Sequence, residues 1–82
     1  MDLDNKLNKI IRKVCNIPDN VQITDLMSSD TVETWDSLAN INLIMELEEN
    51  FKVDFDFSEL INIENWGELK ELVKKKIDGR QL

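Results

Sequence analysis

The chain has 82 residues, which suits a single domain spanning 1–82, and 41% of them are hydrophobic, as in ordinary globular proteins. Ten basic against seventeen acidic residues give a net charge of −7, which argues against nucleic acid as a partner because phosphate contacts need clustered Lys and Arg. With one cysteine and no histidine, the chain cannot form an internal disulfide, a Cys/His zinc site, or a self-contained Ser-His or Cys-His catalytic pair.

Nothing in the sequence indicates a membrane segment. No apolar run approaches the roughly 18–20 residues of a membrane span. The N-terminal sequence Met-Asp-Leu-Asp-Asn-Lys is too polar for a secretory signal peptide. We expect a cytoplasmic protein that does not insert into membranes, and we also expect a monomer.

The charge is distributed unevenly along the chain. Residues 1–18 carry four cations and two acids, and residues 69–82 carry five cations and two acids, so the two ends are +2 and +3. Residues 19–68 hold thirteen acids and one lysine, or −12. Electrostatic steering of a partner therefore belongs to the middle of the chain. The alternative is a solvated acidic surface that only aids solubility.

The first predicted helix covers residues 3–15, where apolar side chains recur at spacings of three and four: Leu3, Leu7, Ile10, Ile11 and Val14. Asp2 or Asp4 can cap its start. Ile17-Pro18 ends it, because the residue before a proline avoids the helical region, and Cys15 sits at its end as a small apolar residue. Residues 16–36 form a long connection that lies over the core, with a short helical turn possible inside it.

The second predicted helix covers residues 37–51, which are rich in strong helix formers and follow Asp36, a good N-cap. After an extended linker comes a short third helix at residues 56–62. Asp56 and Glu59 have the spacing of a capping box, and Phe55 and Leu60 that of a hydrophobic staple.

The fourth predicted helix covers residues 66–77, with Asn65 as its cap, Glu68 three residues later and Gly79 as its terminator. Two Gly and one Pro in the whole chain make strands joined by tight hairpins improbable. The four segments together predict an all-α four-helix bundle with a long first loop and a short third helix.

The second helix has two apolar faces. At about 100° per residue, the face expected to enter the core contains Leu43, Ile44, Leu47 and Phe51. Nearly opposite lies a second stripe, formed by Leu38, Ile41 and Met45, with Glu48 and Glu49 on either side. An apolar stripe with acidic neighbours is typical of a docking site for a basic partner. The alternative is that the loop of residues 16–36 covers this stripe.

The sequence Trp35-Asp36-Ser37-Leu38 places a serine hydroxyl at the first turn of the second helix. The unpaired N–H groups and the positive end of the helix dipole favour a phosphate there. Phosphodiester chemistry on Ser37 would therefore be supported electrostatically. The plainer interpretation is that Ser37 only assists Asp36 in capping.

The segment from Thr34 to Phe51, with Asp-Ser-Leu near its start, resembles the carrier segment of acyl carrier proteins. Phe51-Lys-Val-Asp-Phe55, the short helix and the last helix also match, so the resemblance covers nearly the whole chain. It implies a small acidic four-helix bundle whose serine receives a 4′-phosphopantetheine arm from coenzyme A. The arm's thiol then holds acyl groups as thioesters.

On that resemblance, Ser37 is the attachment residue, and Asp36 caps the helix and helps a phosphopantetheinyl transferase hold its metal. Leu38, Ile41 and Met45 are implied to contact partner enzymes, with Glu48 and Glu49 as acidic recognition positions. Those partners are the transferase and the enzymes that load, transfer or condense acyl groups. The protein is thus expected to be a carrier, not an enzyme; the alternative is a cofactor-free helical interaction module.

The sequence departs from the family pattern at three places. Fatty-acid carriers commonly have acids two and five residues after the serine, where this chain has Ala39 and Asn42. Trp35 replaces the usual Gly or Ala before Asp-Ser-Leu. These departures favour a specialised carrier for a peptide, polyketide or other dedicated acyl pathway over primary fatty-acid synthesis.

A calcium loop is the one metal site that the sequence suggests. Asp54, Asp56 and Ser58 begin such a loop, but its sixth position holds Glu59 instead of Gly. Its twelfth position holds Asn65 instead of Glu. We therefore predict no metal site.

Overall fold

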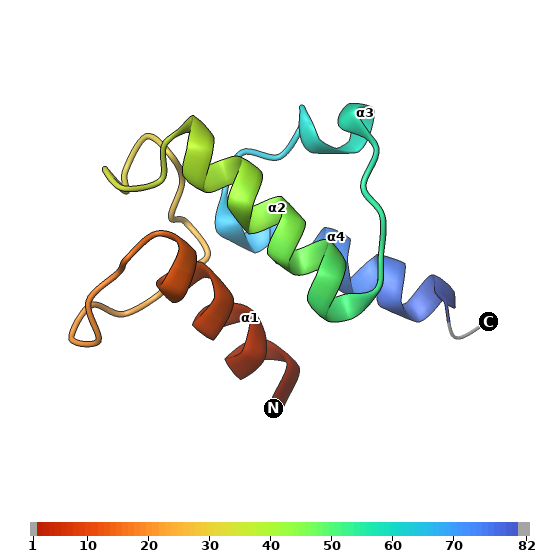
Figure 1. Cartoon of the computed structure of the whole chain (residues 1–82), viewed down its shortest axis with the longest axis horizontal. Coiled ribbons are helices and arrows are strands. Elements are labelled where there is room, and N and C mark those ends of the chain that lie inside the picture. Colours follow the sequence, from red (N-terminus) through yellow and green to blue (C-terminus); the bar gives the residue numbers. More distant parts are fainter. Residues whose placement is uncertain (1, 81–82) are drawn as a thin grey trace.

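The computed structural model describes residues 2–80, and within them the chain forms helices without strands (Figure 1). The elements are α1 (Asp2–Val14), α2 (Ser37–Phe51), α3 (Phe57–Leu60) and α4 (Trp66–Arg80). The predicted all-α, four-helix fold with a long first loop and a short third helix is confirmed. The predicted domain, 1–82, also includes residues 1, 81 and 82, which lie outside the described residues. Between residues 2 and 80, no helix has the length and apolar character needed to cross a bilayer.

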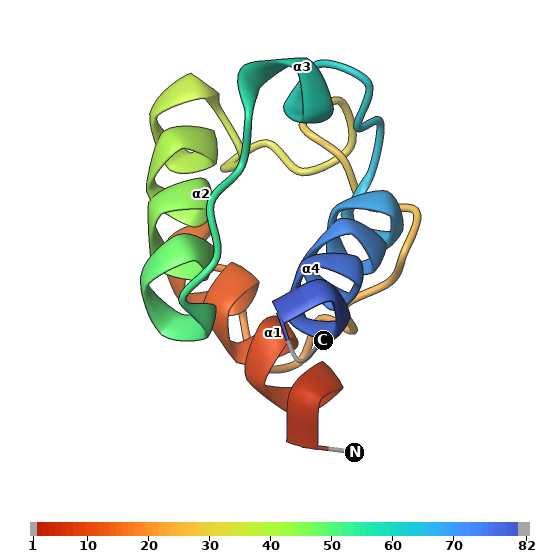
Figure 2. The ribbon, with the colours of Figure 1, turned by 90° about the vertical axis from the view of Figure 1, so that its right-hand side faces the viewer.

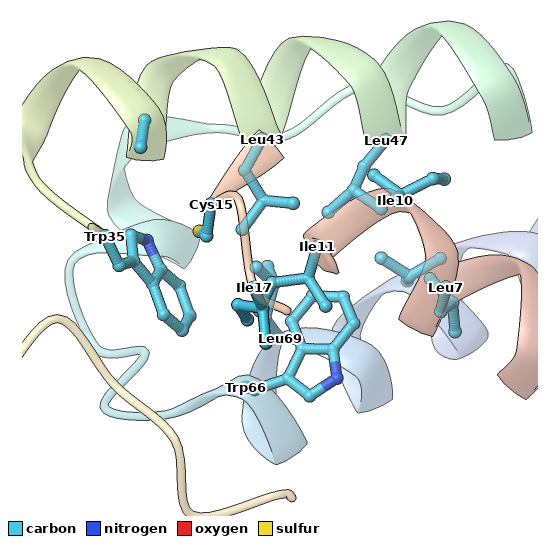
Figure 3. Close-up of a cluster of buried hydrophobic side chains, with 12 residues drawn as sticks. Leu7, Ile10, Ile11, Cys15, Ile17, Trp35, Leu43, Leu47, Trp66 and Leu69 are labelled. Atoms are coloured by element: carbon cyan, nitrogen blue, oxygen red, sulfur yellow. The ribbon is translucent and has the colours of Figure 1, made fainter. Parts of the chain in front are cut away.

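Helix α2 contacts both α1 and α4. Figure 2 shows α2 and α4 on opposite sides of the bundle, with α3 at one end and α1 at the other. The three long helices meet in a core whose innermost side chains are at most 2% exposed: Leu7, Ile11, Cys15, Leu43, Leu47, Trp66, Leu69 and Val73. Figure 3 shows this cluster, with all of these except Val73 labelled. Burying one such side chain stabilises the fold by about 1.5–3 kcal/mol, so this cluster holds the helices together.

Helix α1 ends one residue earlier than predicted, and Asn16 rather than Pro18 ends it. Asn16 adopts a left-handed conformation with φ 53°. The Ile17 N–H donates to the Arg12 carbonyl oxygen at 2.9 Å and the Asn16 N–H to that of Lys13 at 3.4 Å, the pattern of a Schellman motif. Both Cys15 and Ile17 are buried as a result. The predicted place of Cys15, at the helix end, is confirmed.

The start of α1 also differs from the prediction. Asp4 lies inside the helix and does not cap it; its Oδ1 is 3.1 Å from the Lys74 Nζ of α4. The Asp2 side chain, the other predicted cap, lies outside the described part of the chain. The contribution of Asp4 is therefore a link between two helices.

Helix α3 is a single turn, shorter than the predicted residues 56–62. Asp56 precedes it as N-cap, and its N–H donates to Glu59 Oε1 at 2.9 Å, as the capping-box spacing predicted. The chain then turns, so that Ile63 packs against the core while Ile61 stays 60% exposed. An isolated turn is marginally stable, and α3 ends where the chain turns to pack Ile63, which is partly buried, against the core.

Helix α4 begins as predicted and ends later. Asn65 Oδ1 accepts a hydrogen bond from the Glu68 N–H at 2.9 Å, which confirms the cap. The helix continues through Gly79 to Arg80, so the predicted terminator is wrong. Gly79 has no positive φ; glycine permits a left-handed turn but does not impose one.

The loop between α1 and α2 is pinned to the start of α4. The Trp66 N–H donates to the Met27 carbonyl oxygen at 2.7 Å, and the Gly67 N–H donates to that of Asp25 at 2.9 Å. These are first-turn N–H groups that have no partner inside their own helix. The loop contains hydrogen-bonded turns and no helix, and it sends Ile17 and Trp35 into the core.

Candidate functional site

Ser37 is the first residue of α2, and its side chain is exposed. Asp36 precedes it as N-cap, because its Oδ1 accepts a hydrogen bond from the Ala39 N–H at 2.8 Å. This bond fixes the turn that holds the serine. The positive end of a 15-residue helix favours an anion at this hydroxyl.

A cavity of about 450 Å³ lies beside Ser37, between α2, α3, the first loop and the start of α4. Its apolar wall comes from Ile44, Leu60, Ile63 and Leu69. Its polar wall comes from Ser28, Ser29, Asn40, Glu64 and Asn65. The volume lies within the range of small-molecule sites, about 300–1,000 Å³, and the mixed lining suits a ligand with polar groups along an apolar chain.

The second apolar stripe of α2 is exposed. Leu38, Ile41 and Met45 are 67%, 56% and 59% exposed, whereas Leu43 and Leu47 on the other face are fully buried. The loop of residues 16–36 therefore leaves the stripe open, and the alternative that it covers the stripe is wrong. Three large apolar side chains on one exposed helix face form a surface that a partner could bury.

The two acidic side chains beside the stripe differ in their surroundings. Glu49 is exposed. Glu48 is half-buried, and its Oε2 accepts a hydrogen bond from the Phe55 N–H at 3.0 Å. Met45, Glu48 and Glu49 line one surface depression of about 420 Å³. The structure thus brings these three residues together and gives Glu48 an additional role, holding the linker to α3.

A solved structure has the same arrangement of helices along its whole length. It is described as a holo acyl carrier protein from Geobacter metallireducens, determined by solution NMR. The two chains are 34% identical with a TM-score of 0.86, over 99% of this chain and 92% of that one. The chain belongs to the acyl carrier protein family. No protein-family model matches this acyl carrier protein, and no curated protein is significantly similar to it.

The general role of this acyl carrier protein is that of a carrier of acyl groups. The residues of the site fit an attached phosphopantetheine: a serine hydroxyl exposed at a helix start, with a partly polar cavity directly beside it. When attached, such an arm supplies a terminal thiol for thioester formation. Ser37 would hold it, with Asp36 keeping the turn in place.

The acyl carrier protein's own thiol is not suited to that chemistry. Cys15 is 1% exposed in the core cluster (Figure 3). Burial, and to a smaller extent the Asp36 carboxylate, raises the pKa of the Cys15 thiol above its ordinary value. Because the thiolate is the reactive form, Cys15 is an inert part of the core.

Sequence reasoning did not identify Trp35 and Asn40 as parts of this acyl carrier protein's site. Trp35 is 5% exposed and forms one wall of the cavity beside Ser37. Its Nε1–H donates to Asn40 Oδ1 at 3.0 Å. Trp35 precedes α2, so helical periodicity gives no signal for its burial, and its size was the only available hint.

Proposed function

We propose that this acyl carrier protein receives a 4′-phosphopantetheine arm from coenzyme A on Ser37 Oγ and carries acyl groups as thioesters on the arm's thiol. The observation that supports this most is the placement of the serine of an Asp-Ser-Leu motif. Ser37 is exposed at the capped first turn of α2 and lines a cavity of about 450 Å³.

The chain depends on another protein for the attachment step. It has no histidine, and the carboxylate next to Ser37 is engaged as the helix cap. A phosphopantetheinyl transferase is therefore the partner that deprotonates the serine, and Asp36 helps this enzyme hold its metal through the carboxylate oxygen that does not cap the helix. The protein itself is then non-catalytic.

Leu38, Ile41 and Met45 form the surface that the transferase and the acyl-loading, acyl-transfer or condensing enzymes contact. Their exposure, between 56% and 67%, supports this. Glu49, and Glu48 beside it, steer basic partners towards the stripe. The single lysine among residues 19–68 leaves little positive charge to oppose this steering.

The carrier serves a dedicated pathway, such as polyketide or peptide synthesis, and not primary fatty-acid synthesis. Ala39 stands where fatty-acid carriers commonly have an acid, and it is 8% exposed in the core. A carboxylate at this position would be buried without a cation, which is costly. Asn42, the second position where such carriers commonly have an acid, is exposed, so the surface that partners meet lacks that charge.

The experiment is incubation of the apo protein with coenzyme A and a broad-specificity phosphopantetheinyl transferase, followed by intact-mass measurement. The expected result is the addition of one phosphopantetheinyl group, which Ser37→Ala abolishes. Ser28→Ala and Ser29→Ala are matched controls that alter other hydroxyls of the same cavity and keep the shift. An unmodified wild-type protein would favour the cofactor-free interaction module.

A further inference from the structure

Each of the two tryptophans donates its indole N–H to an asparagine side chain, but the two hydrogen bonds have different places in the fold. Trp66 Nε1–H donates to Asn8 Oδ1 at 3.1 Å and joins α4 to α1. Trp35 Nε1–H donates to Asn40 Oδ1 at 3.0 Å, within one short stretch of chain. This second bond closes a loop around Ser37, which lies between the two residues in the sequence.

The tryptophan end of this loop is fixed in the core. The Trp35 side chain is buried, and its backbone N–H donates to the Val32 carbonyl oxygen at 2.9 Å. In Figure 3 the indole nitrogen of Trp35 points towards the first turn of α2. A buried indole N–H usually finds an acceptor. Here the acceptor belongs to the helix that begins at Ser37, so the core holds the start of that helix.

The asparagine end belongs to the first turn of α2. The Asn40 N–H donates to the Asp36 carbonyl oxygen at 2.9 Å, and the Ala39 N–H donates to Asp36 Oδ1 at 2.8 Å. Ser37 thus lies between the partners of a backbone, a cap and a side-chain hydrogen bond. Helix ends open more easily than helix centres. The bond between Trp35 and Asn40 opposes such opening in the turn that carries the serine hydroxyl.

We propose that the Trp35–Asn40 hydrogen bond positions Ser37 for transfer of the arm, so that both residues are positioning residues for that reaction. The proposal rests on the attachment of the arm to Ser37. In that step Ser37 Oγ forms a bond to the phosphorus that carries the pantetheine. The bond from this phosphorus to the leaving adenosine 3′,5′-bisphosphate breaks, and the serine proton goes to the transferase. A small displacement of the attacking oxygen slows such a step strongly.

The alternative is that Asn40 only satisfies a buried donor. Loss of the bond would then lower the melting temperature and leave the kcat of transfer to the folded protein unchanged. The Trp66–Asn8 bond provides the comparison, because it joins the same chemical groups at nearly the same distance and does not enclose Ser37. A kcat that responds to one bond and not to the other therefore separates positioning from stability.

The test removes each bond from either side. Trp35→Phe removes the donor and keeps an aromatic ring, whereas Asn40→Ala removes the acceptor at an exposed residue, where no cavity results. Trp66→Phe and Asn8→Ala are the matched controls. Transfer from coenzyme A by a broad-specificity phosphopantetheinyl transferase is followed by intact mass, below the melting temperature of every variant. Varying the carrier concentration separates kcat from KM.

Loss of the Trp35–Asn40 bond should lower kcat about fivefold, the equivalent of one hydrogen bond. KM should change less, because the exposed stripe of α2 is unaltered. The double variant should be no slower than the slower single variant, since both changes remove the same bond. Hydrogen exchange of the Ala39 amide should accelerate in these variants. Trp66→Phe and Asn8→Ala should keep the wild-type kcat even if they melt at lower temperatures.

Three results would contradict the proposal in different ways. A wild-type kcat in both Trp35→Phe and Asn40→Ala, with the full mass increase, would overturn the positioning role and leave the attachment to Ser37 in place. An equal loss of kcat in Trp66→Phe would also overturn the positioning role, because a general loosening of the fold would then be the cause. Absence of the mass increase in wild type would overturn the attachment, and positioning with it.

Discussion

The backbone N–H of Gly67 donates to the carbonyl oxygen of Asp25 at 2.9 Å, joining the first turn of α4 to the middle of the loop between α1 and α2. The Lys70 Nζ of the next turn lies 2.6 Å from Asp25 Oδ1. This loop ends at Asp36 and Ser37. Its attachment to α4 therefore helps position Ser37, the proposed attachment residue.

We predict that Gly67→Ala destabilises the fold. A Cβ at Gly67 would lie 2.7 Å from the Asp25 Cβ, closer than two carbons can approach. Forcing the loop away should cost about 1–3 kcal/mol, measured by chemical denaturation. Gly79→Ala is the control in the same helix, where nothing lies within 4 Å of the added Cβ. It should stabilise by about 0.5–1 kcal/mol. Equal effects would refute the steric role of Gly67.

We predict an acid-sensitive link between α1 and α4. The hydrogen bond with the Lys74 ammonium holds the pKa of Asp4 below its ordinary 3.8, and the same bond raises the pKa of Lys74 above 10.5. A carboxyl group whose pKa is lowered by folding contributes its full stabilisation at pH values above its ordinary pKa. That contribution is lost as the pH falls through the pKa of the folded state. Lys74, whose pKa is raised by folding, contributes its full stabilisation at pH values below its ordinary pKa of 10.5. That contribution is lost as the pH rises through its higher pKa in the folded state.

Melting temperatures between about pH 6 and about pH 2.5 check this link. Asp4→Asn should show a shallower acid decline than wild type, because its contribution is already absent at neutral pH. Asp54→Asn removes an exposed carboxylate for which the structure describes no ion pair and should keep the wild-type slope. Identical slopes in all three proteins would show that the Asp4–Lys74 pair does not couple folding to pH.

We predict that replacing Glu48 lowers the stability of the fold, whereas replacing Glu49 does not. Glu48→Ala leaves the Phe55 N–H without its acceptor and should cost about 1–2 kcal/mol. Glu48→Gln keeps an acceptor oxygen and should cost less. Glu49→Lys should leave the melting temperature nearly unchanged. A Glu48→Ala protein as stable as wild type would contradict the structural role of that carboxylate.

The proposed steering role of Glu49 is tested by measuring association kinetics. Glu49→Lys should slow association with the transferase by at least about threefold at low salt, with the difference shrinking as salt screens the charges. Asp78→Lys makes the same charge change on α4, away from the stripe, and is the matched control. If both reversals slowed association equally, net charge rather than the stripe would be responsible.

We predict that moderate salt raises the melting temperature. Three ion pairs join cations of α1 and α4 to acids of residues 19–68: Lys13–Glu46, Lys70–Asp25 and Lys76–Glu59. They offset only part of the −12 in that segment. Screening the rest should contribute about 1 kcal/mol, or about 4–8 °C in a domain of this size. A variant with Glu33→Gln and Glu49→Gln should show a smaller rise, and a melting temperature independent of salt would contradict the argument.

Local sequence signals determined α2 and the start of α4. The observed bounds of α2, Ser37–Phe51, equal the predicted range because Asp36 reaches the Ala39 N–H within one turn. The Asn65 cap is equally local, since its partner is the Glu68 N–H. The two apolar faces of α2 also followed from the sequence, because helical geometry alone separates them; that the first loop leaves one of them exposed was decided by the tertiary structure.

Helix ends that depend on packing were less predictable. Asn16 ends α1 in a left-handed conformation, which places Ile17 in the core. Gly79 allows the same conformation, yet α4 continues through it. The sequence permits either outcome at both residues. The hydrophobic contacts that a turn would make decide between them, and those contacts exist only in the folded chain.

The cavity beside Ser37 and the set of side chains that line it arise only in the tertiary structure. Trp35, Asn40 and Asn65 lie in three different segments, and each takes its orientation from a hydrogen bond or from burial. Asn40 and Asn65 meet at one cavity although they lie on different elements. A single-helix pattern shows which side chains share a face, but it cannot show which faces approach one another. The sequence by itself therefore determined the position of Ser37 at the start of its helix, and the packing of α2 against the first loop, α3 and α4 decided what surrounds that serine.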